Sequence, residues 1–589
     1  MWRVTVLYCA FIVATVLSQG TGEDSRVVNL NQGSFRGLKS SDYNVFQFLN
    51  IPYASAPTGA DRFKAPGPPP QWSGIIDAKD RRIICPQVST LLHSTLVIQE
   101  DCLVANIYVP NTVQSNLPVL VLVHGGAYML GWGSMDQPNE LVSSKNIIVV
   151  TFNYRLGPHG FLCLGTEDAP GNAGMKDQVA LLRWVRDNIA EFGGNPNDVT
   201  ISGCSAGGSS VDLLMLSNMT NGLFNKVISE SGCSVNLFSA QLNPVQNARD
   251  FALKHGFTDV MNLNALTRFY TDRGILSLFD ESLLFAKDSY LVFQPCVEND
   301  LGQEIFLADA PENILISGDF KKLPVIYGYA KQEGIFRLPQ FNEWSVEMNE
   351  NFTNFLPADL HFDNETQKAE VARQVQKFYF QDRLVNDGTV SEYIDYFTDA
   401  LFLVGILRNI PLRVRAGHTQ IYLYEYSFTH SGSEVIPQLN GIRGATHCDQ
   451  YLILFDHPSP SEERLNMALT MREIIYNFIT TGNPTPPGSG SSLPTWPQVG
   501  VDRSPHYSVG STIEVAGIPV RERAELWDDL YARYGATPQP PMLDDFVNTT
   551  TPDYEEETTT PEPNSATLNN VFSYKFWIVY TTVILIALK

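Results

Sequence analysis

The sequence predicts an α/β fold, in which helices cover both faces of a central, twisted and mostly parallel sheet. Residues 117–126 and 146–157 form continuous apolar runs rich in β-branched side chains, which are typical of strands buried on both faces. Residues 175–194 have apolar positions at helical spacing and end in two glycines. Strand-like and helix-like segments then alternate along the chain, and this order favours parallel strands joined by helical crossovers.

The later elements continue this order. Residues 198–203 read as a short buried strand, and residues 206–217 after it read as a helix. Further strands are expected at residues 225–232, 323–330 and 421–428.

The net charge of the chain argues against a nucleic-acid partner. The 589 residues carry a net charge of −23 and include no run of basic residues. Because nucleic-acid phosphates require clustered lysine and arginine, we expect no nucleic-acid partner. The composition, 44% hydrophobic and 17% charged, is that of a globular protein with a large core.

Both ends of the chain resemble targeting signals. Residues 1–22 combine one arginine, a short apolar stretch and small residues, which indicates a secretory signal peptide. A globular domain is expected over residues 23–535, followed at 536–566 by an extended stalk rich in proline, threonine and acidic residues.

Residues 567–589 complete the second signal. The apolar run at 576–588 would form a helix of about 20 Å, shorter than the hydrocarbon core of a bilayer. Small residues at Asn564, Ser565 and Ala566, a polar spacer and this terminal run fit a GPI-attachment signal, with a short tail anchor as the alternative. We expect a protein that is held on the outer cell surface through a lipid anchor, or secreted.

The N-glycosylation sequons and the cysteines of the chain are consistent with a secreted protein. Asparagine is followed two residues later by threonine at four N-glycosylation sequons, Asn218, Asn351, Asn364 and Asn548. Removal of the signal peptide would leave seven of the eight cysteines, so at least one thiol should stay free. Cys85 and Cys102 flank a polar loop and are the best candidates for a disulfide, while no cysteine or histidine spacing suggests a metal site.

Ser205 is the candidate nucleophile. It lies at the centre of a G-x-S-x-G pattern, between the strand expected at 198–203 and the helix that follows. A sharp glycine-flanked turn at this point would raise the serine side chain above the sheet. Attack on a carbonyl also needs donors for the oxyanion, and the amides of Gly125, Gly126 and Ala206 could supply them.

A base and an acid should follow the serine in the order acid, then histidine. Glu333 lies just after the strand expected at 323–330 and is the candidate acid. Two histidines compete for the role of base, since His430 follows the strand at 421–428 and His447 lies farther on. Spacing alone does not separate them. His124, beside the two glycines, reads as a structural histidine.

At this point the chain resembles the type-B carboxylesterase and cholinesterase family of α/β-hydrolases, over nearly all of residues 25–535. The matching segments include "EDCLVANIYVP", "VHGGAYMLG", "NYRLGPHGFL", "FGGNPNDVTISGCSAGG", "YGYAKQEG" and "GATHCDQYLILF". The resemblance implies an α/β-hydrolase fold and, through a G-x-x-H stretch, favours His447 over His430. It also implies Glu333 as the acid, oxyanion amides from Gly125, Gly126 and Ala206, and a Cys85–Cys102 disulfide.

Two positions depart from the family pattern. Cys204 stands where the family usually has a glutamate before the nucleophile, and the loop between Cys85 and Cys102 contains no Trp, Tyr or Phe. A cation–π platform for choline from that loop is therefore missing, and both features argue against a cholinesterase. Because the strands that precede them should be neighbours, Cys233 is one candidate partner for Cys204, and spacing leaves the remaining disulfide connectivity open.

These features together predict a serine carboxylesterase that acts on a small-molecule ester and needs no metal or organic cofactor. The alternative is a catalytically weak or inactive adhesion protein on the same fold, which would present its surface to a protein partner not yet identified. Such relatives commonly lose the nucleophile, whereas this chain retains a candidate for each role.

Overall fold

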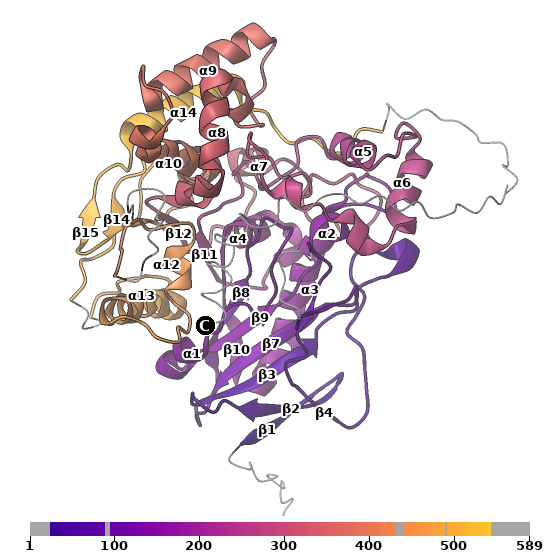
Figure 1. Ribbon diagram of the computed structural model, residues 1–589. Helices are drawn as coiled ribbons and strands as arrows, with labels where there is room; N and C mark the ends of the chain where they lie inside the picture. Colours follow the sequence, from indigo (N-terminus) through magenta and orange to yellow (C-terminus); the bar gives the residue numbers. More distant parts are fainter. Residues whose placement is uncertain are drawn as a thin grey trace, which may run out of the picture.

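A 13-stranded sheet runs through the molecule (Figure 1). The computed structural model describes residues 24–88, 95–431, 443–488 and 492–543, together with residues 433, 441 and 490. The strand order is β1-β2-β3-β7-β9-β8-β10-β11-β12-β13-β14-β15, with β4 paired to β2. A separate two-stranded sheet joins β5 (Ile83–Ile84) to β6 (Val97–Ile98).

The pairings within the central series β9-β8-β10-β11-β12-β13-β14 are all parallel. Outside this series, β1, β2, β3 and β7 pair antiparallel in succession, β7 pairs antiparallel with β9, β15 pairs antiparallel with β14, and β4 pairs parallel with β2. The predicted, mostly parallel sheet is thus present, with antiparallel edges in addition. The strands of the large sheet are β1 (Ser25–Leu30), β2 (Gly33–Lys39), β3 (Val45–Pro52), β4 (Ile75–Asp77), β7 (Val104–Pro110), β8 (Leu117–Val123), β9 (Ile148–Phe152), β10 (Gly194–Cys204), β11 (Lys226–Glu230), β12 (Val325–Ala330), β13 (Ile421–Tyr426), β14 (His506–Val509) and β15 (Ile513–Ala516).

Helices cover both faces of this sheet. Side chains alternate along β8, so that Val119 and Val121 belong to a core with helices α3 and α4, while Leu120 and Leu122 belong to a core with α1 and α13. The α-helices are α1 (Asn139–Lys145), α2 (Gly157–Phe161), α3 (Ala173–Asn188), α4 (Ala206–Leu216), α5 (Pro244–Lys254), α6 (Leu263–Asp272), α7 (Pro311–Ser317), α8 (Phe341–Glu350), α9 (Glu365–Phe380), α10 (Val390–Thr398), α11 (Val404–Arg415), α12 (Asp449–Leu452), α13 (Glu462–Thr481) and α14 (Arg521–Tyr534).

A third core lies outside the sheet. Helices α8, α9, α10 and α14 gather at one end of the molecule (Figure 1) and pack around aromatic side chains such as Trp344, Phe397 and Trp527. A π-helical segment, Asp399–Leu403, joins α10 to α11 and contributes Ala400, Leu401 and Phe402 to the same core. The antiparallel strands and the helical group were not predicted from the sequence.

The end of the described chain still contacts the body. Residues 536–541 fall in the expected stalk, yet the Ala536 amide donates to the Asp359 carbonyl and the Asn299 side chain donates to the Pro541 carbonyl. The signal peptide, most of the stalk and the terminal signal lie outside the described residues. Within the described ranges, no helix has the length and apolar character needed to cross a membrane.

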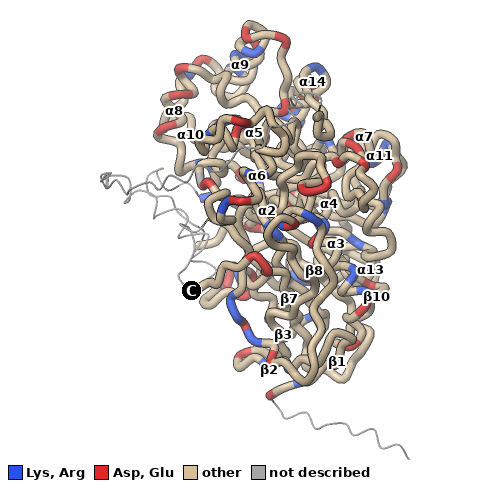
Figure 2. The backbone as a smooth tube through the Cα atoms, turned by 90° about the vertical axis from the view of Figure 1, so that its right-hand side faces the viewer, with Lys and Arg blue, Asp and Glu red and all other residues tan. Residues whose placement is uncertain are grey.

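Charged residues are dispersed over the molecule. Figure 2 shows lysine and arginine scattered among aspartate and glutamate, with no basic stripe on the face in view.

Candidate active site

Ser205 occupies a sharp turn between the end of β10 and the start of α4. Its backbone has φ 61° and ψ −126°, a conformation that residues other than glycine rarely adopt. The Ser205 amide donates to the Glu230 carbonyl at the end of the neighbouring strand β11, over 2.9 Å. The strand–turn–helix context expected for a nucleophile is therefore present.

The glycines of the G-x-S-x-G pattern allow this turn to pack closely. A Cβ atom at Gly207 would lie 2.2 Å from the Val123 carbonyl oxygen, and one at Gly203 would lie 2.5 Å from the carbonyl carbon of Gly207. Since real Cβ atoms do not approach backbone so closely, larger residues would push the turn away from β8. The pattern is thus explained by the packing around Ser205.

Glu333 and His447 form a direct pair. Strand β12 ends at Ala330, and Glu333 follows it as a fully buried side chain. The Nδ1–H group of His447 donates to Glu333 Oε2 over 2.6 Å. The other carboxylate oxygen, Oε1, accepts from the Ser231 hydroxyl at 2.6 Å and from the Ala330 amide at 2.7 Å. These bonds orient the imidazole and leave its Nε2 available for proton exchange.

Aromatic contacts also orient His447. Its ring stacks on Phe402 of the π-helical segment, with centroids 4.1 Å apart, and Phe336 lies 5.5 Å away. The side chain of His447 is 13% exposed, so it can still be reached from solvent. Both Ser205 and His447 are described, and no hydrogen bond joins the serine hydroxyl to the imidazole. Contacts of this kind often close only when a substrate is bound.

His430, the competing base, lies elsewhere. Its ring stacks beside Phe428 with centroids 6.1 Å apart, and its amide donates to the Ser433 hydroxyl. Burial, followed by the positive charge of Arg464, lowers the pKa of His430. The carboxylate of Glu333 is bound by His447 instead.

His124 has the environment of a structural histidine. Its ring is buried, stacks on Tyr154 with centroids 4.3 Å apart, and places Nδ1 2.9 Å from the Gly125 carbonyl oxygen. Burial lowers the pKa of His124 to about 4, so the ring is neutral at neutral pH.

The three residues proposed to bind an oxyanion lie around Ser205. Gly125 is packed against it, because a Cβ atom at Gly125 would lie 2.6 Å from the Cys204 carbonyl oxygen and 3.3 Å from Ser205 Cβ. Gly126 follows with φ +112°, and Ala206 is the first residue of α4. The amide of Ala206 is thus at a helix N-terminus, where unpaired N–H groups favour negative charge.

Glu230 and Ser231 lie beside Ser205 and Glu333 and were missed from the sequence. Tyr424 donates to the two carboxyl oxygens of buried Glu230 at 2.8 and 2.9 Å, and Gln450 donates to the Ser231 hydroxyl at 2.6 Å. Burial raises the pKa of Glu230 to about 8, so this acid is protonated at neutral pH. The order of the strands could have indicated both residues, because β11 pairs with β10 and ends directly beside the serine turn.

The predicted Cys204–Cys233 pairing is wrong, because Cys204 forms a disulfide with Cys448. Cys204 belongs to the core with α1 and α13, whereas Cys233 belongs to the core with α3 and α4 on the other face of the sheet. Neighbouring strands therefore do not bring these two side chains together. Cys233 is the free, buried cysteine of the described chain, and burial raises the pKa of its thiol.

Two further disulfides lie in the described chain. Cys85 pairs with Cys102, as the family resemblance implies. Cys163 pairs with Cys296, a connection that spacing did not indicate. The described residues contain no group of three or more His, Cys, Asp or Glu side chains that could hold a metal ion.

The sequons of the described chain lie at the surface. Asn218, Asn351 and Asn364 are exposed, and Asn548 lies outside the described residues. Asn364 also caps helix α9, where its side chain accepts from the Gln367 amide.

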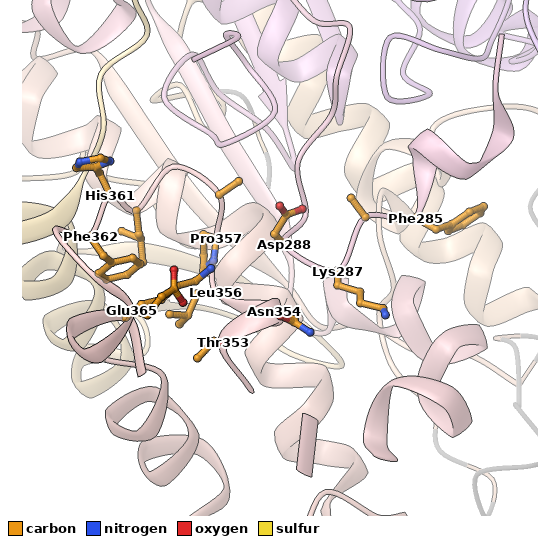
Figure 3. Close-up of a pocket in the computed structure, with 14 residues that line it drawn as sticks. Phe285, Lys287, Asp288, Thr353, Asn354, Leu356, Pro357, His361, Phe362 and Glu365 are labelled. Carbon is orange, nitrogen blue, oxygen red and sulfur yellow. The ribbon is translucent and has the colours of Figure 1, made fainter. Parts of the chain in front are cut away.

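A separate cavity of about 690 Å³ opens between residues 285–288 and residues 353–368 (Figure 3). Lys287, Asp288 and Glu365 contribute charged groups to its lining. None of the residues expected to carry catalysis lines this cavity.

Comparisons with known proteins agree with the geometry. The family model described as "Carboxylesterase family" matches residues 24–527. The juvenile hormone esterase of Heliothis virescens is 32% identical, over 84% of this chain and 92% of the relative. Carboxylesterase 1C of Mus musculus is 31% identical, over 93% of this chain and 100% of the relative.

Solved structures of esterases are also similar to this chain. The crystal structure of juvenile hormone esterase from Manduca sexta, with OTFP covalently attached, superimposes with a TM-score of 0.76. The two sequences are 28% identical, and the match covers 86% of this chain and 100% of that chain. The structural neighbours are esterases of the α/β-hydrolase fold, which is the fold of this chain.

Proposed function

Because the chain belongs to the carboxylesterase family and is a carboxylic ester hydrolase, we propose that it cleaves esters through an acyl-enzyme formed on Ser205. His447 is the base and Glu333 the acid of the proposed triad. The observation that carries this proposal is the 2.6 Å bond from His447 to buried Glu333, beside a serine held at positive φ. The covalent OTFP adduct of the Manduca sexta esterase supports covalent chemistry in this family.

The first half of the reaction forms the acyl-enzyme. Ser205 Oγ attacks the ester carbonyl carbon, and its proton moves to His447 Nε2. The carboxylate of Glu333 holds Nδ1–H and stabilises the resulting imidazolium. The oxyanion receives hydrogen bonds from the amides of Gly125, Gly126 and Ala206. The C–O bond then breaks, and the alcohol leaves with the proton from His447.

The second half regenerates the enzyme. A water molecule gives its proton to His447 Nε2 as its oxygen attacks the acyl carbonyl, and Ser205 takes the proton back as the acid leaves. Each proton passes through His447 and is exchanged with Ser205, the leaving alcohol or water, so the proposed reaction requires no metal and no organic cofactor.

The position of the protein in the cell is also part of the proposal. Three disulfides in the described chain suit an oxidising compartment, in agreement with the signal peptide expected at 1–22 and the sequons. We propose a secreted hydrolase domain that residues 567–589 direct to a GPI anchor on the outer cell surface.

Hydrolysis of p-nitrophenyl acetate by the purified, folded ectodomain tests the proposed function. Because p-nitrophenol leaves during acylation and the acetyl-enzyme then accumulates when its hydrolysis is the slower step, we expect a burst of p-nitrophenol approaching one equivalent per enzyme, followed by steady turnover. We expect acetylcholine to be a poor substrate, since Cys204 replaces the usual glutamate and the 85–102 loop has no aromatic ring. Folded protein that hydrolyses no acyl ester would contradict the proposal.

Gly125→Ala tests the oxyanion site. The added Cβ atom would lie 2.6 Å from the Cys204 carbonyl oxygen, so the loop must move away from Ser205 and withdraw its amides. We expect kcat to fall by roughly 10²- to 10³-fold, the effect of losing one oxyanion donor. Gly274→Ala is the matched control, because its Cβ atom would meet open space. Steady-state kinetics on both variants measure the effect, and an unchanged kcat in Gly125→Ala would remove this glycine from the proposed site.

A further inference from the structure

The Cys204–Cys448 disulfide joins the two halves of the proposed catalytic site. Cys204 is the last residue of β10 and directly precedes Ser205, while Cys448 directly follows His447 and caps α12. The two cysteines are 244 positions apart in the sequence, and their Cα atoms lie 6.1 Å apart. A single covalent link therefore connects the neighbour of the serine to the neighbour of the histidine.

Other contacts attach the histidine segment to different parts of the sheet. The Ala445 carbonyl accepts from the Gln332 amide, and His447 donates to Glu333, both just beyond strand β12. Gln450 donates to Ser231 at the end of β11. The disulfide attaches the same segment to the serine turn itself. It thus supplies a direct restraint on the distance between the Ser205 turn and the imidazole.

The two cysteines differ in burial, and the more deeply buried one has the more fixed position. Cys204 is 2% exposed and packs in the core with Leu120 and Ile228, so its position is determined by the centre of the sheet. Cys448 is half-buried and adopts the left-handed region at φ 66°. The well-packed end of the bond therefore holds the more exposed histidine segment.

The disulfide also determines whether the Cys448 sulfur near His447 Nε2 carries a proton. The sulfur of Cys448 lies 3.6 Å from this nitrogen. In the disulfide that sulfur carries no proton, whereas a free thiol there could donate to Nε2 and compete with the serine hydroxyl. Oxidation of Cys448 therefore leaves Nε2 available to Ser205.

We propose that the Cys204–Cys448 disulfide is a positioning element of the active site, which holds His447 at the distance and orientation needed to take the proton of Ser205. This inference rests on the proposed serine mechanism. Cys204 and Cys448 are positioning residues, since they act on the reaction through Ser205 and His447.

The Cys204→Ala/Cys448→Ala double variant tests this role. Both cysteines are replaced, because a lone Cys448 thiol would place a new donor near Nε2. We expect kcat for p-nitrophenyl acetate to fall by roughly 10- to 100-fold, as for small misplacements of catalytic groups, with KM nearly unchanged. The rate of labelling of Ser205 by a fluorophosphonate should fall in the same proportion.

Cys163→Ala/Cys296→Ala is the control, since it removes a disulfide from elsewhere in the chain. It should lower the thermal midpoint while leaving kcat within about twofold of the wild type, because it alters stability and not triad geometry. An equal loss of kcat in both variants would assign the effect to general stability and overturn the proposal. So would a folded Cys204→Ala/Cys448→Ala variant with wild-type kcat.

Mild reduction of the wild-type protein gives a second test that needs no variant. Dithiothreitol transfers two electrons and two protons to the S–S bond, which yields two thiols and the cyclic disulfide of the reagent. Cys448 is half-buried, whereas the four cysteines of the other two disulfides are buried, so this bond should be reduced first. Alkylation and peptide mapping identify the reduced pair.

We expect kcat to fall at least as far as in the Cys204→Ala/Cys448→Ala variant as the two thiols become alkylatable, because reduction removes the restraint and also places the Cys448 thiol near Nε2. The kcat should return when the reagent is removed and the bond reforms. Full kcat with these two thiols free would overturn the proposal. A wild-type protein that is folded yet neither labelled at Ser205 nor active on esters would refute the serine mechanism, and this inference with it. A labelled and active wild type with an unaffected double variant would refute the positioning role alone.

Discussion

Ser205→Ala should lower kcat for p-nitrophenyl acetate by about 10⁵- to 10⁶-fold, with the fold and thermal midpoint retained. The substitution removes the oxygen that forms the acyl-enzyme in the proposed mechanism, and the burst of p-nitrophenol should disappear with it. The side chain is small and its hydroxyl makes no hydrogen bond to His447 in the described structure, so little stability should be lost. Stopped-flow and steady-state kinetics measure both quantities.

Ser277→Ala is the matched control, because Ser277 is exposed and lies on a short helical turn away from the described site. It should have wild-type kinetics. If Ser205→Ala kept more than about a hundredth of the wild-type kcat, the residual rate would exceed what binding and an oxyanion site provide on their own, and another nucleophile would be required.

Glu333→Gln should lower kcat by about 10⁴-fold, the loss seen when the acid of such a triad becomes an amide. Oε1 of Glu333 accepts from the Ser231 hydroxyl and the Ala330 amide, so the amide oxygen of glutamine would take this place. Its NH₂ group would then face His447 Nδ1 and force the imidazole proton onto Nε2. In that tautomer Nε2 cannot accept the proton of Ser205.

Glu230→Gln provides the control for this change on the neighbouring buried acid. Burial raises the pKa of Glu230 to about 8, so at pH 7 glutamine replaces a side chain that is already neutral. We expect kcat to change by less than about fivefold for this reason. Measured at pH 7, equal losses in the two variants would contradict the assignment of Glu333 as the acid that orients His447.

Much of the fold could be predicted because its central strands are buried on both faces. The apolar runs at 117–126, 146–157 and 421–428 became β8, β9 and β13, and the periodic segment at 175–194 became α3 with slightly earlier bounds. The helical group of α8, α9, α10 and α14 was not predicted, since its aromatic core depends on contacts between segments far apart in the sequence.

The candidate site was predictable to the extent that its residues lie in local patterns. The turn at Ser205 follows from a glycine pattern between a strand and a helix, and Glu333 follows from its place after a strand. Spacing alone left the choice between His430 and His447 open, and the family resemblance favoured His447, which is the histidine bonded to Glu333 in the structure. The Cys204–Cys448 bond could not be predicted, because strand order does not show on which face of the sheet each side chain lies.

The central claim is that Ser205 is an activated nucleophile, and mapping the adduct of a fluorophosphonate on the purified ectodomain tests it most directly. We predict one adduct per molecule, located by mass spectrometry on the peptide that contains Ser205 and absent from Ser205→Ala. Folded protein that remains unlabelled, or that carries the adduct on another residue, would contradict the claim.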